Sequence, residues 1–555
     1  QLAMVESPFL LCNGLALLFW LRFMGTSATA FSKAWWPPLL LAGIFLGLSM
    51  SSKWSTLFLV ASFCLVAMQD LWSLASDRLF SPSTILRHVF ARILCLVVIP
   101  SVIYVGVFWI HFALLSSTGN GAKYMTPEVQ VSLKGAKNPE FFANVSYGSY
   151  ISLRHEASPC GYVTSGSSRY LKGSQMHTVW CGAKDDSSAM FSIEHRYIMN
   201  SGGIENPPTH PEELLKDGDI IRLKHTNTLR WLRSHDFRPA LQNNTAQSEV
   251  CTHGDPKTSD FDDLWQIETA PRNAPVRAMQ TRLRLVHFQR KCSLMSRTFK
   301  NGSYSEVSCV QNKERVGTVW RIEGNRNPKY PAGAQKIRYK PAGFWSKFME
   351  TQRHMLETFS NTTRTHPYVS NPLDWPIARR GVAVWHDPKS PAQIFVLGNP
   401  VVSIATTGSV VLCVIFVAVL WVAAQRHVPL SNATIEQLTS AEQILVLVFC
   451  NYVPFFFAKT ELFLHDGFPA LYAAFLCVGL IFDAFTLRFR SPSRIVMAGV
   501  LVACVLFAFV KWSALTYGFP MSVEQCEGLK WRKAWDWFCR EAPEGSTRPS
   551  AAAFP

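Results

Sequence analysis

The sequence predicts a polytopic α-helical membrane protein with an inserted all-β domain. Long apolar runs fill residues 8–115 and 400–515, and about 20 apolar residues are enough to cross a bilayer as a helix. Residues 116–395 between them are polar and contain short β-prone segments separated by Gly, Asn and Asp. Such spacing of short strands and turns is typical of an all-β domain.

We expect eight membrane spans, four on each side of the polar insert. They lie at roughly 8–23, 38–51, 54–71, 93–115, 401–424, 442–459, 467–486 and 494–515. The polar residues Ser51, Ser52 and Lys53 separate the second span from the third and indicate a tight hairpin. We divide the chain into membrane spans at 1–115, a connector at 116–140, the β domain at 141–326, a connector at 327–399, spans at 400–515 and a tail at 516–555.

Basic residues in the loops predict the orientation. Cytoplasmic loops of membrane proteins carry an excess of Lys and Arg. The loop after the third span contains Arg78, Arg87 and Arg92. The loop before the last span contains Arg488, Arg490 and Arg494. If both loops are cytoplasmic, alternation of the spans puts the insert, the hairpin at Lys53 and the C-terminal tail on the lumenal side.

N-glycosylation sequons in the insert agree with a lumenal location. Their acceptors are Asn144, Asn243, Asn301 and Asn361. A further triplet at Asn432 falls in a loop expected to be cytoplasmic, so we expect it to be a chance match.

The chain carries a net charge of +16, which raises the possibility of nucleic-acid binding. The basic residues cluster beside the apolar runs, as expected for loops of a membrane protein. No basic block interleaved with aromatic residues suggests a nucleic-acid surface. We therefore expect the membrane, and no nucleic acid, as a partner.

Cysteine spacing predicts no metal site. Seven of the fourteen cysteines lie in apolar runs, where they suit inert packing. Five lie in the insert, at Cys160, Cys181, Cys251, Cys292 and Cys309. Five is an odd number, and their pairing cannot be derived from sequence.

The insert contains an internal repeat. A Leu-x-His pattern occurs at residues 153–155, 223–225 and 285–287. Each copy is followed by a closing motif of an aromatic residue, a polar residue, Ile and Glu, at residues 191–194, 265–268 and 320–323. One such unit is too small to bury a core, so the three units are expected to close together into a threefold assembly.

These repeats resemble MIR domains, which form a β-trefoil. The second repeat matches best, through residues 221–225 and 231–239. The resemblance makes His225, His235 and Asp236 candidates for a sugar- or peptide-binding pocket. An alternative for Asp236 is to cap a turn.

The flanking segments resemble the protein O-mannosyltransferase family. The resemblance is collinear over nearly all 555 residues and is carried by residues 51–54, 70–72, 111–112, 371–376, 380–385, 393–400, 464–465, 469–472 and 515–518. It implies a glycosyltransferase of the C-type fold in the membrane of the endoplasmic reticulum. The implied donor is dolichyl-phosphate mannose, the implied acceptors are Ser or Thr hydroxyls of proteins, and a homodimer or a heterodimer with a related mannosyltransferase is expected. No cofactor and no metal is implied.

The same resemblance places the catalytic base in a lumenal loop before Gln1. Within the chain, Glu6 opens the first span and is the remaining candidate, since the family usually has Asp there. The alternative is an interfacial charge in water. We expect residues 1–555 alone to lack turnover for this reason.

Transfer from a lipid phosphate needs cations near the leaving phosphate. Lys53, at the expected lumenal end of a hairpin, and His111, near the lumenal end of its span, are candidates for this role. Arg379 and Arg380 are further candidates, because guanidinium groups bind phosphate bidentately. The alternatives are a Lys53 side chain that extends to the interface and arginines paired with carboxylates. Trp375 and Trp385 suit an interfacial aromatic belt.

Two other functions compete with a transferase. One is a membrane-tethered MIR binding module or a catalytically inactive subunit of a mannosyltransferase complex. The other is a channel, but no pore-lining segment with a filter is found in the sequence.

Overall fold

The structure is a computed structural model. It describes residues 6–26, 30–77, 80–122, 125–156, 161–182, 187–200, 203–205, 207–210, 212–239, 247–254, 260–296, 305–311, 317–360, 366–387, 390–458, 460–487 and 489–540. The chain forms two compact units, of which the helical unit comprises residues 1–111 and 362–555 and the β unit residues 112–361. The connector expected at 327–399 is therefore divided between the two units.

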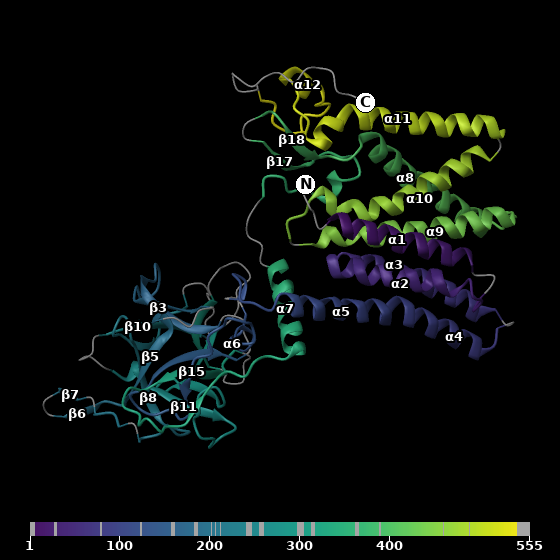
Figure 1. Ribbon diagram of the computed structural model, residues 1–555. Helices are drawn as coiled ribbons and strands as arrows, with labels where there is room; N and C mark the ends of the chain where they lie inside the picture. The colour runs from purple at the N-terminus through teal and green to yellow at the C-terminus, as the bar shows by residue number, and fades with distance from the viewer. Residues whose placement is uncertain are drawn as a thin grey trace. The chain divides into compact units, whose positions relative to one another are not determined.

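The helical unit is built from long apolar helices that pack side by side (Figure 1). Its N-terminal elements are α1 (Glu6–Gly25), α2 (Trp36–Ser52), α3 (Thr56–Ser76), α4 (Pro82–Ile93), the π-helical turn η2 (Leu94–Val98) and α5 (Ile99–Leu114). Its C-terminal elements are η6 (Pro372–Asp374), β17 (Val382–His386), β18 (Gln393–Val396), α8 (Pro400–Gln425), α9 (Asn432–Tyr452), η7 (Val453–Phe457), η8 (Leu464–Gly467), α10 (Phe468–Thr486), α11 (Ser491–Tyr517) and α12 (Val523–Gly528).

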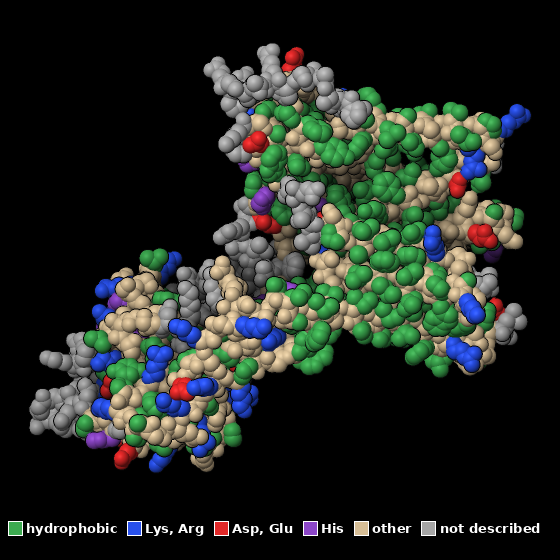
Figure 2. Space-filling model, viewed as in Figure 1, with side chains coloured by type: hydrophobic (Ala, Val, Ile, Leu, Met, Phe, Trp, Pro, Cys, Tyr) green, Lys and Arg blue, Asp and Glu red, His purple; other side chains and the backbone are tan. Residues whose placement is uncertain are grey.

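Seven helices within the described part of the chain are long and apolar enough to cross a membrane, and the 17-residue α2 is a shorter apolar helix. Large apolar side chains remain exposed along these helices, and Figure 2 shows them gathered over the face of the helical unit that is in view. Soluble proteins rarely expose apolar surface on this scale, so this surface faces lipid. The chain is a multi-pass membrane protein, as predicted.

One expected loop is a helix instead. The segment Pro82–Leu114 is continuously helical, so Arg87 and Arg92 lie on α4 and not between spans. Arg92 is buried and its guanidinium pairs with Asp70 on α3. Its charge therefore serves helix packing and does not contribute to a basic loop.

Glycine allows α2 to approach the bend after α4 closely. A Cβ atom at Gly43 would lie 1.9 Å from the carbonyl oxygen of Cys95, and one at Gly47 would lie 2.9 Å from Ile103 Cβ. Small residues four positions apart let helix backbones come together in membranes. This contact holds α2, and with it the hairpin that follows, in a fixed place.

The β unit contains twelve strands of one sheet that belong to three successive groups of four. The strands are β2 (Tyr150–His155), β3 (Tyr162–Arg169), β4 (His177–Gly182), β5 (Met190–His195), β8 (Ile220–His225), β9 (Trp231–His235), β10 (Gln247–His253), β11 (Trp265–Ala270), β12 (Arg282–His287), β13 (Ser293–Ser296), β14 (Ser305–Val310) and β15 (Trp320–Arg326). Each group begins with a Leu-x-His strand and ends with a closing-motif strand, as the repeat predicts.

Strand pairing makes this domain a β-trefoil. The first and last strands of each group form a closed ring through the pairs β2–β5, β5–β8, β8–β11, β11–β12, β12–β15 and β15–β2. The middle strands form three hairpins, which pair with one another through β4, β10 and β14. The predicted fold class, a polytopic helical protein with an inserted trefoil, is thus confirmed.

Further short elements complete the β unit. They are α6 (Pro127–Gln130), β1 (Phe141–Phe142), β6 (Ile198–Asn200), β7 (Gly203–Glu205), β16 (Lys336–Ile337), α7 (Phe344–Ser360) and the 3-10 turns η4 (Ser187–Ala189) and η5 (Phe261–Asp263). Disulfides join Cys292 to Cys309 and Cys526 to Cys539, and Cys181 is also disulfide-bonded. Cys251 is a buried free thiol.

Candidate functional site

Four ionisable side chains meet at one end of the helical unit. Lys53, the residue after α2, donates from Nζ to Asp466 Oδ1 at 2.6 Å. Glu6, at the start of α1, lies 3.6 Å from His465 through its Oε1 atom and His465 Nε2. We call Glu6, Lys53, His465 and Asp466 the polar cluster.

The α2–α3 hairpin fixes Lys53. Ser49 and Thr56 share a hydrogen bond of 2.8 Å between their hydroxyls, and the Thr56 hydroxyl also donates to the carbonyl of Lys53. Trp54 Nε1 donates to the Tyr104 hydroxyl at 2.9 Å. The tight hairpin expected from sequence is present, and its own hydrogen bonds point the Lys53 ammonium at η8.

The turn η8 supplies the other half of the cluster. Asp466 Oδ2 accepts from the backbone N–H of Phe463 at 2.9 Å, which closes a capping box around the turn. His465 stacks on the ring of Phe463 with 5.6 Å between ring centroids. The Asp466 carboxylate is therefore oriented by its own turn before it meets Lys53.

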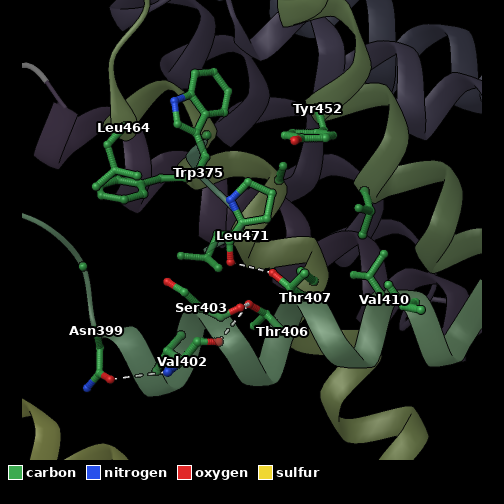
Figure 3. Close-up of a pocket in the computed structure, with 18 of the residues that line it drawn as sticks. Trp375, Asn399, Val402, Ser403, Thr406, Thr407, Val410, Tyr452, Leu464 and Leu471 are labelled. Carbon is green, nitrogen blue, oxygen red and sulfur yellow. Dashed lines mark hydrogen bonds between the residues drawn. The ribbon is translucent and has the colours of Figure 1, made fainter. Parts of the chain in front are cut away.

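A pocket of about 260 Å³ adjoins η8 (Figure 3). Leu464 and Gly467 of η8 line it, so the turn that carries His465 and Asp466 also forms a wall of the pocket. One face of α8 lines it as well, at Val402, Ser403, Thr406, Thr407, Val410 and Val411. This spacing of three and four residues is one side of a helix.

The pocket wall is apolar in effect. Thr406 donates its hydroxyl to the carbonyl of Val402 at 2.8 Å, and Thr407 donates to that of Pro376 at 2.6 Å, so both hydroxyls are already used. Figure 3 shows these bonds and the N-cap of α8, where Asn399 Oδ1 accepts from the N–H of Val401 and Val402. Pro400 follows at the first helical position, which needs no N–H donor.

Trp375 closes the pocket near η8. Its side chain is buried, with Nε1 donating to Ser370 Oγ at 2.9 Å. A Cβ atom at Gly467 would lie 2.7 Å from the Trp375 ring. Trp375 therefore packs inside the helical unit and is not part of an interfacial belt, whereas Trp385 is 40% exposed.

The other expected phosphate ligands lie outside the polar cluster. Arg380 donates to the backbone carbonyls of Val369 and Pro367 at 2.8 and 3.1 Å. Arg379 is exposed and lies 3.7 Å from Asp374. Both guanidinium groups thus stabilise the loop that carries Trp375.

His111 is exposed near the end of α5, and its ring lies 6.1 Å from that of Phe108. Its role in phosphate binding stays a prediction.

The candidate ligand residues of the trefoil do not share one pocket. His225 is fully buried, with Nδ1 at 2.9 Å from Thr228 Oγ1 and Nε2 at 2.9 Å from the carbonyl of Ser188. Asp236 is exposed and pairs with Arg290 at 2.9 Å. His225 therefore lies in the core, and Asp236 at the surface.

His225 belongs to a set of three equivalent core residues. His155 donates to the carbonyl of Gly317 and His287 to that of Asp262, at 2.8 and 2.9 Å. Each of these rings also packs against an aromatic ring of a closing motif. The Leu-x-His motif thus supplies one buried histidine per repeat that ties the barrel to a neighbouring turn.

His235 lies in a buried group with Glu249 and Cys251 on the paired strands β9 and β10. Its Nε2 atom lies 3.2 Å from Cys251 Sγ. Sequence spacing did not reveal this group. The available signal was the two-residue alternation of Glu249 and Cys251, which places both side chains on one face of a strand.

The sequons are only partly described. In the first, Ser146 is fully buried and its hydroxyl lies 3.0 Å from Asn327 Nδ2, so the sequon at Asn144 is packed into the folded domain. Asn243, Asn301 and Asn361 lie outside the described residues. Asn432 is exposed at the first position of α9.

Three protein families match the chain in order. Residues 1–116 match dolichyl-phosphate-mannose-protein mannosyltransferase. Residues 165–320 match the MIR domain. Residues 344–535 match the C-terminal four TMM region of protein-O-mannosyltransferase.

Individual relatives cover almost the whole chain. It is 32% identical over 558 residues to dolichyl-phosphate-mannose–protein mannosyltransferase 1 of Candida albicans, which covers 97% of this chain and 62% of the relative. The protein of the same name from Saccharomyces cerevisiae is 32% identical over 520 residues, covering 90% and 63%. The chain thus spans less than two thirds of the length of these two relatives.

A solved structure also matches. It is the protein O-mannosyltransferase Pmt1–Pmt2 complex of S. cerevisiae bound to the sugar donor, with a TM-score of 0.85 and 29% identity. The match covers 97% of this chain and 74% of that chain.

Proposed function

Because this chain belongs to the protein O-mannosyltransferase family, we propose that its protein transfers mannose from dolichyl-phosphate mannose to Ser or Thr hydroxyls of proteins. The observation that carries this proposal is the polar cluster beside an apolar pocket, within a fold whose solved relative was bound to the sugar donor. A lipid-linked sugar is an amphiphile, so its site needs polar groups for the sugar phosphate and an apolar surface for the lipid chain.

The proposed reaction exchanges one glycosidic bond for another. The bond between mannose C1 and the phosphate oxygen breaks, and a bond from C1 to the acceptor oxygen forms. The acceptor proton passes to a general base, and the leaving dolichyl phosphate takes the bonding electrons. The protein must therefore stabilise a phosphate that gains negative charge as the bond breaks.

Lys53 is the proposed phosphate ligand. Its ammonium lies at the end of a helix hairpin, 26% exposed, and is held by Asp466. A phosphate can compete with that carboxylate for the same ammonium, and His465 stands next to it in the turn. Glu6 stays a candidate for proton transfer, since it is the carboxylate of the cluster that Lys53 does not hold.

The pocket beside η8 is the proposed place for the apolar chain next to the phosphate. Its α8 and α9 walls present Val402, Val410, Val448 and Phe449. An isoprenoid chain has no hydrogen-bonding groups, so a wall on which the Thr406 and Thr407 hydroxyls are satisfied internally suits it.

Location and assembly are proposed on the same basis. We place the protein in the endoplasmic-reticulum membrane with the trefoil in the lumen, as the basic loop before α11 and the insert's sequons support. A related mannosyltransferase chain is the proposed partner, since the solved relative is a complex of two such proteins. Glycan mapping tests the orientation, and a glycan on Asn432 would contradict it.

The activity is tested on the whole protein in microsomes with radiolabelled dolichyl-phosphate mannose and a Ser/Thr peptide. We expect label in the peptide that is released by β-elimination. Donor binding without transfer, in a preparation where a known mannosyltransferase is active, would instead favour a binding module or an inactive subunit.

A further inference from the structure

The trefoil contains a buried group of side chains that can ligate a metal ion. One ligand atom each from His235, Glu249 and Cys251 lies within 4.8 Å of the others. Met176 adds a thioether, with Sδ at 3.4 Å from Cys251 Sγ. We propose that these residues bind a thiophilic transition-metal ion, and that zinc is the ion that the ligand set suits best.

The spacing of the ligand atoms fits one small ion. His235 Nε2 lies 3.2 Å from Cys251 Sγ and 3.8 Å from Glu249 Oε1. With zinc–ligand bonds of about 2.0–2.3 Å, neighbouring ligands of a tetrahedral site lie about 3.3–3.8 Å apart. The three protein ligands and Met176, or a water molecule, would then complete four positions.

Strand geometry produces the site. Glu249 and Cys251 are two positions apart on β10 and share one face, and His235 on β9 is paired directly with Glu249. Cross-strand partners on one face come within side-chain reach. A rigid pair of strands therefore holds the ligands, and no loop closure is needed.

Glu249 is a buried carboxyl that has no Lys or Arg beside it among the described residues. Glu249 is 1% exposed, and Oε1 accepts from the Ser174 hydroxyl. Among the described residues, no Lys or Arg forms an ion pair with it. Arg233, on the same face of β9, is engaged by Asp260 and Asp262 at 2.5 and 3.1 Å. Buried charges are otherwise paired or coordinate metals.

The chemistry of the ligands selects the ion. Thiolate and thioether sulfur favour zinc and copper(I), while a carboxylate oxygen favours zinc of these two. Cys251 is a free thiol with no measurable exposure in a domain whose other described cysteines are disulfide-bonded. Metal binding would keep this thiol from oxidation.

The test uses the whole protein purified in detergent without chelator. Mass-spectrometric metal analysis is expected to find about one zinc ion per chain. Glu249→Gln and Cys251→Ser, both close in shape to the native residues, should lose it. Cys504→Ser is the matched control, because it removes an exposed thiol on α11 and should leave the zinc content unchanged.

A second readout does not depend on a variant that folds. Apo protein reconstituted with cobalt(II) should show sulfur-to-metal charge-transfer absorption, which reports a thiolate ligand. Absence of this band, or zinc below stoichiometric amounts in the wild-type protein, would show that the group is only hydrogen-bonded. Uptake of copper(I) but not zinc would overturn the assignment to zinc.

Discussion

Lys53 and Asp466 lie 413 positions apart in the chain, and their side chains meet at 2.6 Å. The pair joins the end of α2 to η8, and so connects the helices before the trefoil with those after it. Their side chains are 26% and 11% exposed. Partial burial strengthens the attraction, because the surroundings screen charge less than water does.

Lys53→Ala should cost much more activity than Lys33→Ala. A hydrogen bond from a charged group is worth roughly 1.5–3 kcal/mol, and each 1.36 kcal/mol in the transition state changes the rate about tenfold. Lys33 is exposed in the segment between α1 and α2 and serves as the matched control. Initial rates of mannose transfer at matched expression measure the difference.

Lys53→Arg keeps the charge but replaces a compact ammonium with a planar guanidinium, so intermediate activity is expected. Near-normal turnover of all three variants, with unchanged donor affinity, would remove Lys53 from the active site.

Asp466→Asn tests whether the carboxylate positions Lys53. Loss of the negative charge should free the ammonium, lower kcat and leave the dependence on acceptor concentration unchanged. If the two residues act together, the double variant should be only slightly less active than Asp466→Asn alone. The effects of substituting two residues in contact are generally not additive. Additive losses in a double-mutant cycle would separate their roles.

The sequence predicted the helices and the trefoil because both can be recognised from the sequence itself. The membrane spans follow from length and apolarity alone, and the trefoil follows from a motif that occurs three times. The roles of individual charges did not follow. Arg92 was expected in a loop, but α4 begins at Pro82 and includes it. From α4, Arg92 pairs with Asp70 on α3.

Long-range contacts explain what the sequence left out. Glu6 and Lys53 were candidates by position, but their partners His465 and Asp466 come from a turn more than four hundred residues later. Histidine side chains can bind sugars, but His225 is buried and makes two hydrogen bonds within the domain. Its role is therefore structural. A local sequence pattern predicts neither how deeply a side chain is buried nor which distant residue it contacts.

Gly467→Ala should impair donor use more than Gly479→Ala. A methyl group at Gly467 meets the Trp375 ring at 2.7 Å, whereas nothing lies within 4 Å of one at Gly479 on α10. Overpacking of this kind costs typically about 1–3 kcal/mol and should displace Trp375 from the pocket wall. The KM for dolichyl-phosphate mannose is the measurement. Equal KM values for the two variants at equal stability would mean that the pocket does not hold the donor.

The trefoil should lose stability as the pH falls below about 6.5, for a reason that lies in its repeats. Burial lowers the pKa of His155, His225 and His287 below the ordinary value of 6.5. Each histidine also donates a hydrogen bond to a backbone carbonyl, which raises its pKa by a smaller amount. The unfolded chain therefore takes up protons near pH 6.5 that the folded domain does not. The free energy of unfolding is then fully retained above that pH and falls below it.

Three such groups can give a slope of up to about 4 kcal/mol per pH unit, since one pKa unit corresponds to 1.36 kcal/mol. Hydrogen exchange of β12 and β15 peptides in the whole protein, at pH 7.5 and 5.5 and corrected for intrinsic rates, measures the opening free energy. His287→Gln, which keeps an N–H donor but does not titrate, should reduce the slope by up to about 1.36 kcal/mol per pH unit. His427→Gln, at an exposed position after α8, should leave it unchanged. An opening free energy that is the same at both pH values would show that the folded domain takes up as many protons as the unfolded chain, so that burial does not hold these histidines neutral.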